Sequence, residues 1–106
     1  KGIFFSEYVK ILNGVLGLSP REAEVFSFLL VKDSEGNSSN INTKVIRDEI
    51  TKKYGISSAN YSRYLGVIRA KGLIIRGQTG KWVINDIVRP IVKDGVFELK
   101  FVLGIE

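Results

Sequence analysis

Residues 57–85, SSANYSRYLGVIRAKGLIIRGQTGKWVIN, contain a helical pattern followed by two short strand-like runs. A serine at either of the first two positions can cap the helix, and a Lys-Gly pair ends it. The apolar runs 73–76 and 81–84 flank a short linker with glycine at both ends, which is typical of a β-hairpin. This stretch therefore predicts a helix that leads directly into a hairpin.

The positive charge of the protein is concentrated in the same stretch. The whole chain has 16 basic and 11 acidic residues and a net charge of +5. Five of the basic residues and none of the acidic ones fall within residues 57–85, so the remainder of the chain is neutral. Chance clustering on a solvated face is one explanation, and a surface that meets phosphate groups is the other. The five are Arg63, Arg69, Lys71, Arg76 and Lys81.

Two helices are expected ahead of this stretch. The first runs from about Phe5 to Leu16 and is ended by the glycine that follows. The second begins at a capping box, in which Ser19 caps the helix, Glu22 bonds back to the Ser19 amide and the intervening proline fits the first turn. This second helix runs to about Val31. The inward residues predicted by helical spacing are Phe5, Tyr8, Val9, Leu12, Val15, Leu16, Ala23, Phe26, Leu29 and Leu30.

A polar segment separates these helices from the next one. Residues 32–42, KDSEGNSSNIN, lack periodicity, so a loop is expected there. A third helix is expected from Thr43 to Tyr54, and Gly55 ends it in a left-handed conformation. A tight turn over residues 55–57 then leads into the helix described first.

The C-terminal residues predict a second hairpin. The runs Ile87–Val92 and Val96–Leu103 flank Lys93-Asp94-Gly95, whose composition favours a turn. The expected fold class is therefore α+β, with four helices followed by a β-hairpin and a C-terminal hairpin. Residues 1–106 are expected to form a single domain, with a core over 18–85 and an extension over 86–106. Phe97, Leu99, Phe101 and Leu103 alternate with polar residues and predict one apolar face on the last strand.

The order of elements leads to a known family. Two short helices joined by a tight turn form a helix-turn-helix, in which the second helix can enter the major groove of DNA while the first braces it. Residues 43–71 have this arrangement. The runs ISSANYSRYL (56–65) and IRAKGLI (68–74) resemble the recognition helix and first wing strand of winged-helix transcription regulators. The resemblance covers residues 18–85, and it implies that the helix contacts base edges, that the wing touches the adjacent groove or backbone and that two copies form a dimer, as in many members.

The helix after Ser57 has two predicted faces at about 100° per residue. The inward face is Tyr61, Leu65, Ile68 and Gly72, and the outward face is Ala59, Asn60, Arg63, Gly66, Val67 and Ala70. On the outward face, Asn60 can pair with adenine and Arg63 with guanine through two hydrogen bonds each. Arg63 is the first candidate for base readout, and a phosphate contact or a solvated arginine is the alternative.

Further candidate DNA-binding residues surround this helix and the hairpin. Three serines near the helix start can hold a phosphate or serve only as caps. Residues around the glycine-flanked hairpin tip can approach a sugar-phosphate chain closely. Tyr64 is expected to pack with its ring, and Trp82 is expected to pack against the hairpin or core. The complete set is Ser57, Ser58, Asn60, Ser62, Arg63, Tyr64, Arg69, Arg76, Gln78, Thr79 and Lys81.

Composition argues against several classes of chemistry. The chain has no Cys and no His, which excludes disulfides, zinc-thiolate sites, imidazole catalysis and haem attachment. The run 77–81 is similar to the end of a phosphate-binding loop, but Ile75 and Trp82 stand where that motif needs glycine and Ser or Thr. The close carboxylate pairs lack a neighbouring nucleophile or base. We therefore expect no cofactor, no metal and no enzymatic activity.

The overall composition is that of an ordinary globular protein, with 44% hydrophobic and 25% charged residues. No apolar run approaches the roughly 18 residues that a membrane helix needs, and no signal segment is recognisable. A cytoplasmic protein without a membrane partner is expected.

Two functions remain open. The leading one is double-stranded DNA binding as a transcription regulator, with helix 58–71 in the major groove and residues 73–84 as the wing. A homodimer is expected, because a single short recognition helix offers little specificity. The contact would come from the first helix with Phe4 and Phe5, or from the C-terminal hairpin.

The alternative is a protein-interaction or structural assembly module, such as a replication or phage-type component, that does not bind DNA specifically. The small, mildly apolar strip of Val67 and Ala70 would suit a close protein partner. The strand 96–103 would suit one as well, because an edge strand can pair with another chain.

Overall fold

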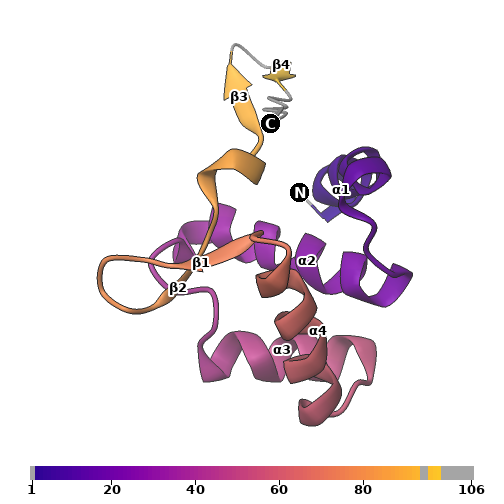
Figure 1. Ribbon diagram of the computed structural model, residues 1–106, viewed down its shortest axis with the longest axis vertical. Coiled ribbons are helices and arrows are strands. Elements are labelled where there is room, and N and C mark those ends of the chain that lie inside the picture. The colour runs from indigo at the N-terminus through magenta and orange to yellow at the C-terminus, as the bar shows by residue number, and fades with distance from the viewer. Residues whose placement is uncertain (1, 94–95, 99–106) are drawn as a thin grey trace.

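Four helices and two β-hairpins follow one another in a computed structural model that describes residues 2–93 and 96–98. The α+β class expected from the sequence is confirmed, and Figure 1 shows α2 between α1 and the α3–α4 pair. The helices are α1 (Gly2–Leu16), α2 (Pro20–Lys32), α3 (Lys44–Tyr54) and α4 (Ser58–Ala70). The hairpins are β1 (Ile74–Arg76) with β2 (Trp82–Ile84), and β3 (Ile91–Lys93) with β4 (Val96–Glu98).

The corner between α1 and α2 is held by side chains on either side of it. The Ser19 hydroxyl accepts the Glu22 N–H at 3.2 Å, and the Ser19 N–H donates to the Glu22 carboxylate at 2.9 Å. The predicted capping box is therefore confirmed. The Asn13 amide accepts the Leu18 N–H at 2.7 Å and donates to the Leu18 carbonyl at 3.0 Å. Both sets of bonds hold the end of α1 against the start of α2.

α1 differs from its predicted form in length and in one residue of its inner face. It begins at Gly2 rather than at Phe5. Val15, which was expected to face inward, is 64% exposed. Val15 lies about 60° around the helix from the buried Leu12, on the side of the exposed Ile11, so α2 does not cover it.

The segment after α2 is not wholly the loop that its composition predicts. The chain continues as a π-helical turn, η1 (Asp33–Asn37), in which Gly36 has a φ of 102°. The Ser34 hydroxyl donates to the Val31 carbonyl at 2.7 Å, and the Asn37 amide donates to the Lys32 carbonyl at 3.0 Å. Polar side chains that favour loops here satisfy the last carbonyls of a helix instead.

α3 and α4 form the predicted pair of helices joined by a tight turn. The Thr43 hydroxyl caps α3 by accepting the Ile46 N–H at 3.2 Å. Gly55 ends α3 with a φ of 62°, a left-handed conformation that favours glycine. The Ser57 hydroxyl then caps α4 by accepting the Asn60 N–H at 3.1 Å. The left-handed Gly55 and a serine cap at the start of α4 are as expected from the sequence, whereas Thr43, expected as the first residue of its helix, is the cap instead.

The hairpin β1–β2 follows α4 directly. Its register places Ile74 opposite Ile84 and Arg76 opposite Trp82. The N–H of Ile41 donates to the Trp82 carbonyl at 3.0 Å, so the segment before α3 lies beside β2. The hairpin is therefore joined to the end of α4 by the chain and to the segment before α3 by this hydrogen bond.

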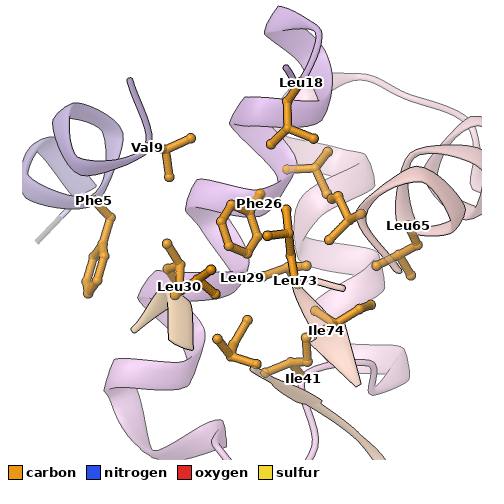
Figure 2. Packing of buried hydrophobic residues seen from close by; sticks show 14 of the residues in the cluster. Phe5, Val9, Leu18, Phe26, Leu29, Leu30, Ile41, Leu65, Leu73 and Ile74 are labelled. Carbon is orange, nitrogen blue, oxygen red and sulfur yellow. The ribbon is translucent and has the colours of Figure 1, made fainter. Parts of the chain in front are cut away.

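The core collects apolar side chains from α1 to α4 and from the first hairpin. Figure 2 shows Phe26 and Leu73 near its centre, between Phe5 of α1 and Ile74 of β1. Tyr61, Leu65 and Ile68 are buried, as expected for the inner face of α4. The buried residues are Phe5, Tyr8, Val9, Leu12, Leu18, Val25, Phe26, Leu29, Leu30, Ile41, Ile46, Ile50, Tyr61, Leu65, Ile68, Leu73, Ile74, Ile84 and Val88.

The C-terminal part begins with a helical turn rather than with a strand. Ile87 and Val88, expected at the start of a strand, lie in the 3-10 turn η2 (Asp86–Val88), and the strand begins at Ile91. The Asn85 side chain caps this turn by accepting the Ile87 N–H at 3.1 Å, and the Tyr8 hydroxyl joins α1 to the turn by donating to the Val88 carbonyl at 2.7 Å. β3 and β4 form the expected antiparallel pair, and Figure 1 shows them at the opposite end of the molecule from α3 and α4. The rest of the predicted last strand, 99–103, and the apolar face assigned to it lie outside the described residues.

An ion pair joins the end of α2 to the segment after η2. The Arg89 guanidinium donates to both carboxylate oxygens of Asp33, at 2.9 and 3.1 Å, and also to Asp86. The hydrogen bond to Asp33 raises the pKa of Arg89 above its usual range. Asp33 is only 11% exposed, and Arg89 supplies the counter-charge to its carboxylate.

We expect Arg89→Ala to lower the free energy of unfolding by roughly 1–3 kcal/mol, because the Asp33 carboxylate would keep its burial and lose its counter-charge. Urea unfolding followed by circular dichroism measures this. Lys10→Ala is the matched control, since it removes an exposed ion pair with Glu7 that should contribute less than about 0.5 kcal/mol. Equal losses in the two variants would contradict the prediction.

Candidate nucleic-acid interface

The outer face of α4 is the side of the helix opposite to its buried residues. Tyr61 and Ile68 are fully buried against the core, so the side of the helix opposite to them faces solvent. Ala59, Asn60, Arg63 and Ala70 are exposed, as predicted. Gly66 and Val67 are only half exposed, and Val67 packs against the core rather than projecting outward. The exposed apolar strip predicted at Val67 and Ala70 is thus narrower than expected.

Arg63 is held by two neighbours on its own helix. Its guanidinium lies 5.2 Å from the centre of the Tyr64 ring, and one of its nitrogens donates to the Asn60 amide oxygen at 3.4 Å. Tyr64 is half-buried and packs against the core, as predicted. Stacking on an aromatic face leaves the N–H edge of the guanidinium free to meet another group. The two predicted base-reading residues therefore lie side by side on the exposed face.

A tryptophan brings together two arginines from different elements. Trp82 of β2 is half-buried against the core, and the guanidinium of Arg69 lies 5.5 Å from its ring centre. Arg76, its cross-strand neighbour, lies 5.0 Å from the same ring centre. The last turn of α4 and the end of β1 thus present two cations around one ring. The prediction for Trp82 as a packing residue is confirmed, but its role in placing the arginines was missed, because the expected runs 73–76 and 81–84 place Lys81 opposite Arg76, whereas the observed register places Trp82 there.

The tip of the hairpin is an exposed tight turn. The Gly77 N–H donates to the Lys81 carbonyl at 2.8 Å, and Gly80 has a φ of 79°. The Arg76 guanidinium donates to the Gly80 carbonyl at 3.3 Å and steadies the turn. Gln78, Thr79 and Lys81 are all exposed around it, as expected for a wing tip.

The predicted site residues form two groups along α4. Ser57, Ser58, Asn60, Ser62 and Arg63 lie in its first half, whereas Arg69 lies at its end beside the hairpin residues. Figure 1 shows the start of α4 at the far end of the helix from β1 and β2. The hydroxyl of Ser57 is used as the helix cap, so the capping role that the sequence left open is confirmed for this serine.

The charged side chains of this surface are all positive. The five cations of residues 57–85 are all exposed, and none of them forms an ion pair within residues 2–93 and 96–98. The ion pairs of the described chain lie within α1, within α2, between Lys32 of α2 and both η1 and α3, and around Arg89. Cations without carboxylate partners keep their full field for an anion from solution. The chemistry that this surface supports is phosphate binding.

Other kinds of site find little support in the part of the chain that the structure describes. No group of three or more carboxylates is placed there to hold a metal ion. None of its helices has the length and apolar character that crossing a bilayer requires. No protein-family model, curated protein or solved structure matches this sequence.

Tyr61 is the buried polar group beneath the outer face of α4. Its hydroxyl is inaccessible to solvent and has no hydrogen-bond partner among the described residues. Burial raises the pKa of this hydroxyl from its ordinary value of 10.0 to about 12, although the nearby Arg47 guanidinium acts in the opposite direction. The folded protein therefore strongly favours the neutral phenol.

Because the pKa is raised on folding, Tyr61 should make stability fall as pH rises from about 10 to 12, with no loss below pH 10. A rise in pKa from 10.0 to about 12 corresponds to about 2–3 kcal/mol. Tyr61→Phe should remove this loss, and at neutral pH it should be at least as stable as the wild type, because it deletes an unpaired buried hydroxyl. Urea unfolding between pH 8 and 11.5 tests this, and parallel pH profiles for the two proteins would refute it.

Proposed function

We propose that this protein is a winged-helix regulator that binds double-stranded DNA through α4 and the β1–β2 hairpin. The observation that carries the proposal is the set of five exposed, unpaired cations on these two adjacent elements. The order α2, α3, α4, β1 and β2 agrees with the helices and wing of the winged-helix regulators that the sequence resembles. The bond from Ile41 to Trp82, which ties the segment before α3 to the hairpin, supports one rigid unit.

In the proposed complex, α4 lies in the major groove with its first half against the bases. Arg63 and Asn60 read base edges there, since both are exposed and adjacent. Arg69, Arg76 and Lys81 contact phosphates beside the groove, where Trp82 sets the spacing of the two arginines. Occupancy of the DNA site then controls transcription or replication nearby.

Binding to a random-sequence duplex should depend steeply on salt. If the five cations neutralise about five phosphates, log affinity falls with log salt concentration at a slope of roughly −4 to −5. The triple variant Arg63→Ala, Arg76→Ala, Lys81→Ala should bind more weakly and with a slope of about −2, because it loses two phosphate contacts and the cation that Arg63 places in the groove. Fluorescence anisotropy over a range of sodium chloride concentrations measures both quantities.

A charge-matched control separates position from total charge. Lys10→Ala, Lys44→Ala, Lys52→Ala removes three exposed cations outside residues 57–85 and gives the same net charge as the first triple variant. It should keep a slope near that of the wild type. Salt-insensitive binding by the wild type, or equal effects of the two triple variants, would overturn the proposed interface.

We also propose that two copies pair through the outer face of α1. This face exposes Ile3, Ile11 and Val15, three of the six large apolar side chains found exposed among the described residues. The exposed Gly14 beside them has open space around its Cβ position, so another helix can approach closely there. Phe5, expected to contribute to such a contact, is instead buried in the core and unavailable.

Ile11→Lys should shift the protein from dimer to monomer, because it places a charge in the middle of the proposed apolar contact. Light scattering coupled to size-exclusion chromatography measures the mass in solution. Val45→Lys is the matched control, since Val45 is a comparably exposed apolar residue on α3. A wild type that is monomeric at high micromolar concentration would rule out the α1 pair.

The same apolar face is the observation that favours the alternative function. A protein-interaction module that does not bind DNA would also expose an unpartnered helix face. The DNA-binding experiment separates the two functions. A protein-interaction module should show no salt-dependent binding to the duplex and no difference between the two triple variants.

A further inference from the structure

A small cleft lies where α3, α4 and the first hairpin meet. It has a volume of about 180 Å³, and its walls come from residues far apart in the sequence. Polar and aromatic side chains line it together with the apolar Leu65 and Ile74. The lining residues that matter for binding are Asn42, Arg47, Ser62, Gly66, Arg69 and Trp82.

The cleft carries two positive charges and no negative one. Arg47 of α3 and Arg69 of α4 both line it, and no carboxylate does. Throughout the described chain, neither guanidinium forms an ion pair or a hydrogen bond. Arg47 lies 5.6 Å from the centre of the Tyr61 ring, and Arg69 lies 5.5 Å from that of Trp82. Stacking in this way leaves the donor edges of both guanidinium groups available to an anion.

Further polar groups complete the lining. The Ser62 hydroxyl is exposed and can donate to an oxygen in the cleft. The side-chain oxygen of Asn42 is buried and has no hydrogen-bond partner among the described residues. This oxygen can only accept a hydrogen bond, so it does not bind an oxyanion, and the donors that line the cleft are the two guanidinium groups and the Ser62 hydroxyl.

Gly66 keeps the cleft open. It lies within α4, where glycine costs up to about 1 kcal/mol relative to alanine, and nothing lies within 4 Å of the position that a Cβ would take. A larger side chain at this position would project into the cleft. At about 180 Å³ the cleft is smaller than the pockets of roughly 300–1,000 Å³ that hold drug-sized ligands. Its size and charge suit a single tetrahedral oxyanion.

We propose that this cleft binds one phosphate group between Arg47 and Arg69. The source of the phosphate that we favour is the backbone of bound DNA beside the hairpin, and this part rests on the proposed function. Arg47 then adds a phosphate contact from α3 to those of α4 and the wing, and Gly66 determines whether the phosphate can enter. A free phosphate-bearing small molecule has the same chemistry and is the other source.

The first arm of the test measures binding of a short random-sequence duplex. Arg47→Gln should weaken binding about tenfold at 0.1 M salt and reduce the slope of log affinity against log salt by about 0.9. Gly66→Leu should weaken binding to a similar degree by filling the cleft, whereas Gly66→Ala should leave it unchanged. Lys52→Gln, which removes an exposed cation of α3 outside the cleft, is the matched control and should have no effect. Thermal unfolding of every variant establishes that it is folded.

The second arm measures the melting temperature of the full chain in sodium phosphate and in sodium chloride of equal ionic strength. A rise in phosphate that Arg47→Gln and Gly66→Leu abolish supports the cleft, because only a bound anion stabilises in a manner that depends on these residues. If phosphate stabilises the wild type in this way while neither the wild type nor any variant binds the duplex, the cleft binds a free phosphate compound and the proposed function is wrong.

The remaining outcomes are also decisive. If both cleft variants weaken duplex binding and the controls do not, the phosphate comes from DNA. If the wild type binds duplex, the cleft variants bind it equally well and inorganic phosphate has no specific effect, the cleft proposal is overturned and the proposed function stands. If the wild type responds to neither probe, both proposals fail.

Discussion

Burial of the inner face of α4 is the constraint on which the rest of the interface depends. Tyr61, Leu65 and Ile68 occupy one side of the helix, and α2 packs against that side. A rotation of α4 by one residue would bring polar or charged groups into the core, at a cost of several kcal/mol for each unpaired charge. The rotation of the helix is therefore set by three apolar residues. Because of it, Asn60 and Arg63 must face solvent.

Trp82 has a comparable role for the hairpin. Its ring packs against the core, its carbonyl accepts the Ile41 N–H, and its two arginine neighbours come from α4 and β1. A cation over an aromatic ring contributes about 0.5–1 kcal/mol at an exposed site, enough to favour one arrangement of a long side chain. The positions of Arg69 and Arg76 relative to each other thus follow from one residue. The two arginines of the proposed surface therefore have a defined spacing, and no carboxylate among the described residues forms an ion pair with them.

Predictions from the sequence succeeded where the cause is local. The capping box at Ser19, the serine cap of α4 and the left-handed Gly55 depend on residues within one helical turn of each other. The first hairpin depends on two short runs and the turn between them, and it was also predicted within one residue.

The failures arise where a distant segment decides the outcome. The exposure of Val15 depends on which side of α1 packs against α2, and the half-burial of Val67 depends on the core beneath α4. The helical turn at Ile87 is accompanied by the bond from Tyr8 to Val88, which spans 80 positions in the sequence. Periodicity within one segment contains no information about such neighbours.

The sequence by itself determined which stretch carries the net charge, where most helices begin and end, and which side of α4 is apolar, because each of these is a property of contiguous residues. Only the tertiary structure decided that Arg69 and Arg76 meet at Trp82, and that Arg47 faces the same cleft as Arg69. Arg47 is followed by Asp48 and Glu49, so along the sequence its charge is offset, whereas in space it lies over Tyr61 with no carboxylate in the cleft. The physical reason is that packing α3 and α4 against α2 and the hairpin selects which charges become neighbours, and charges act through distance in space rather than distance along the chain.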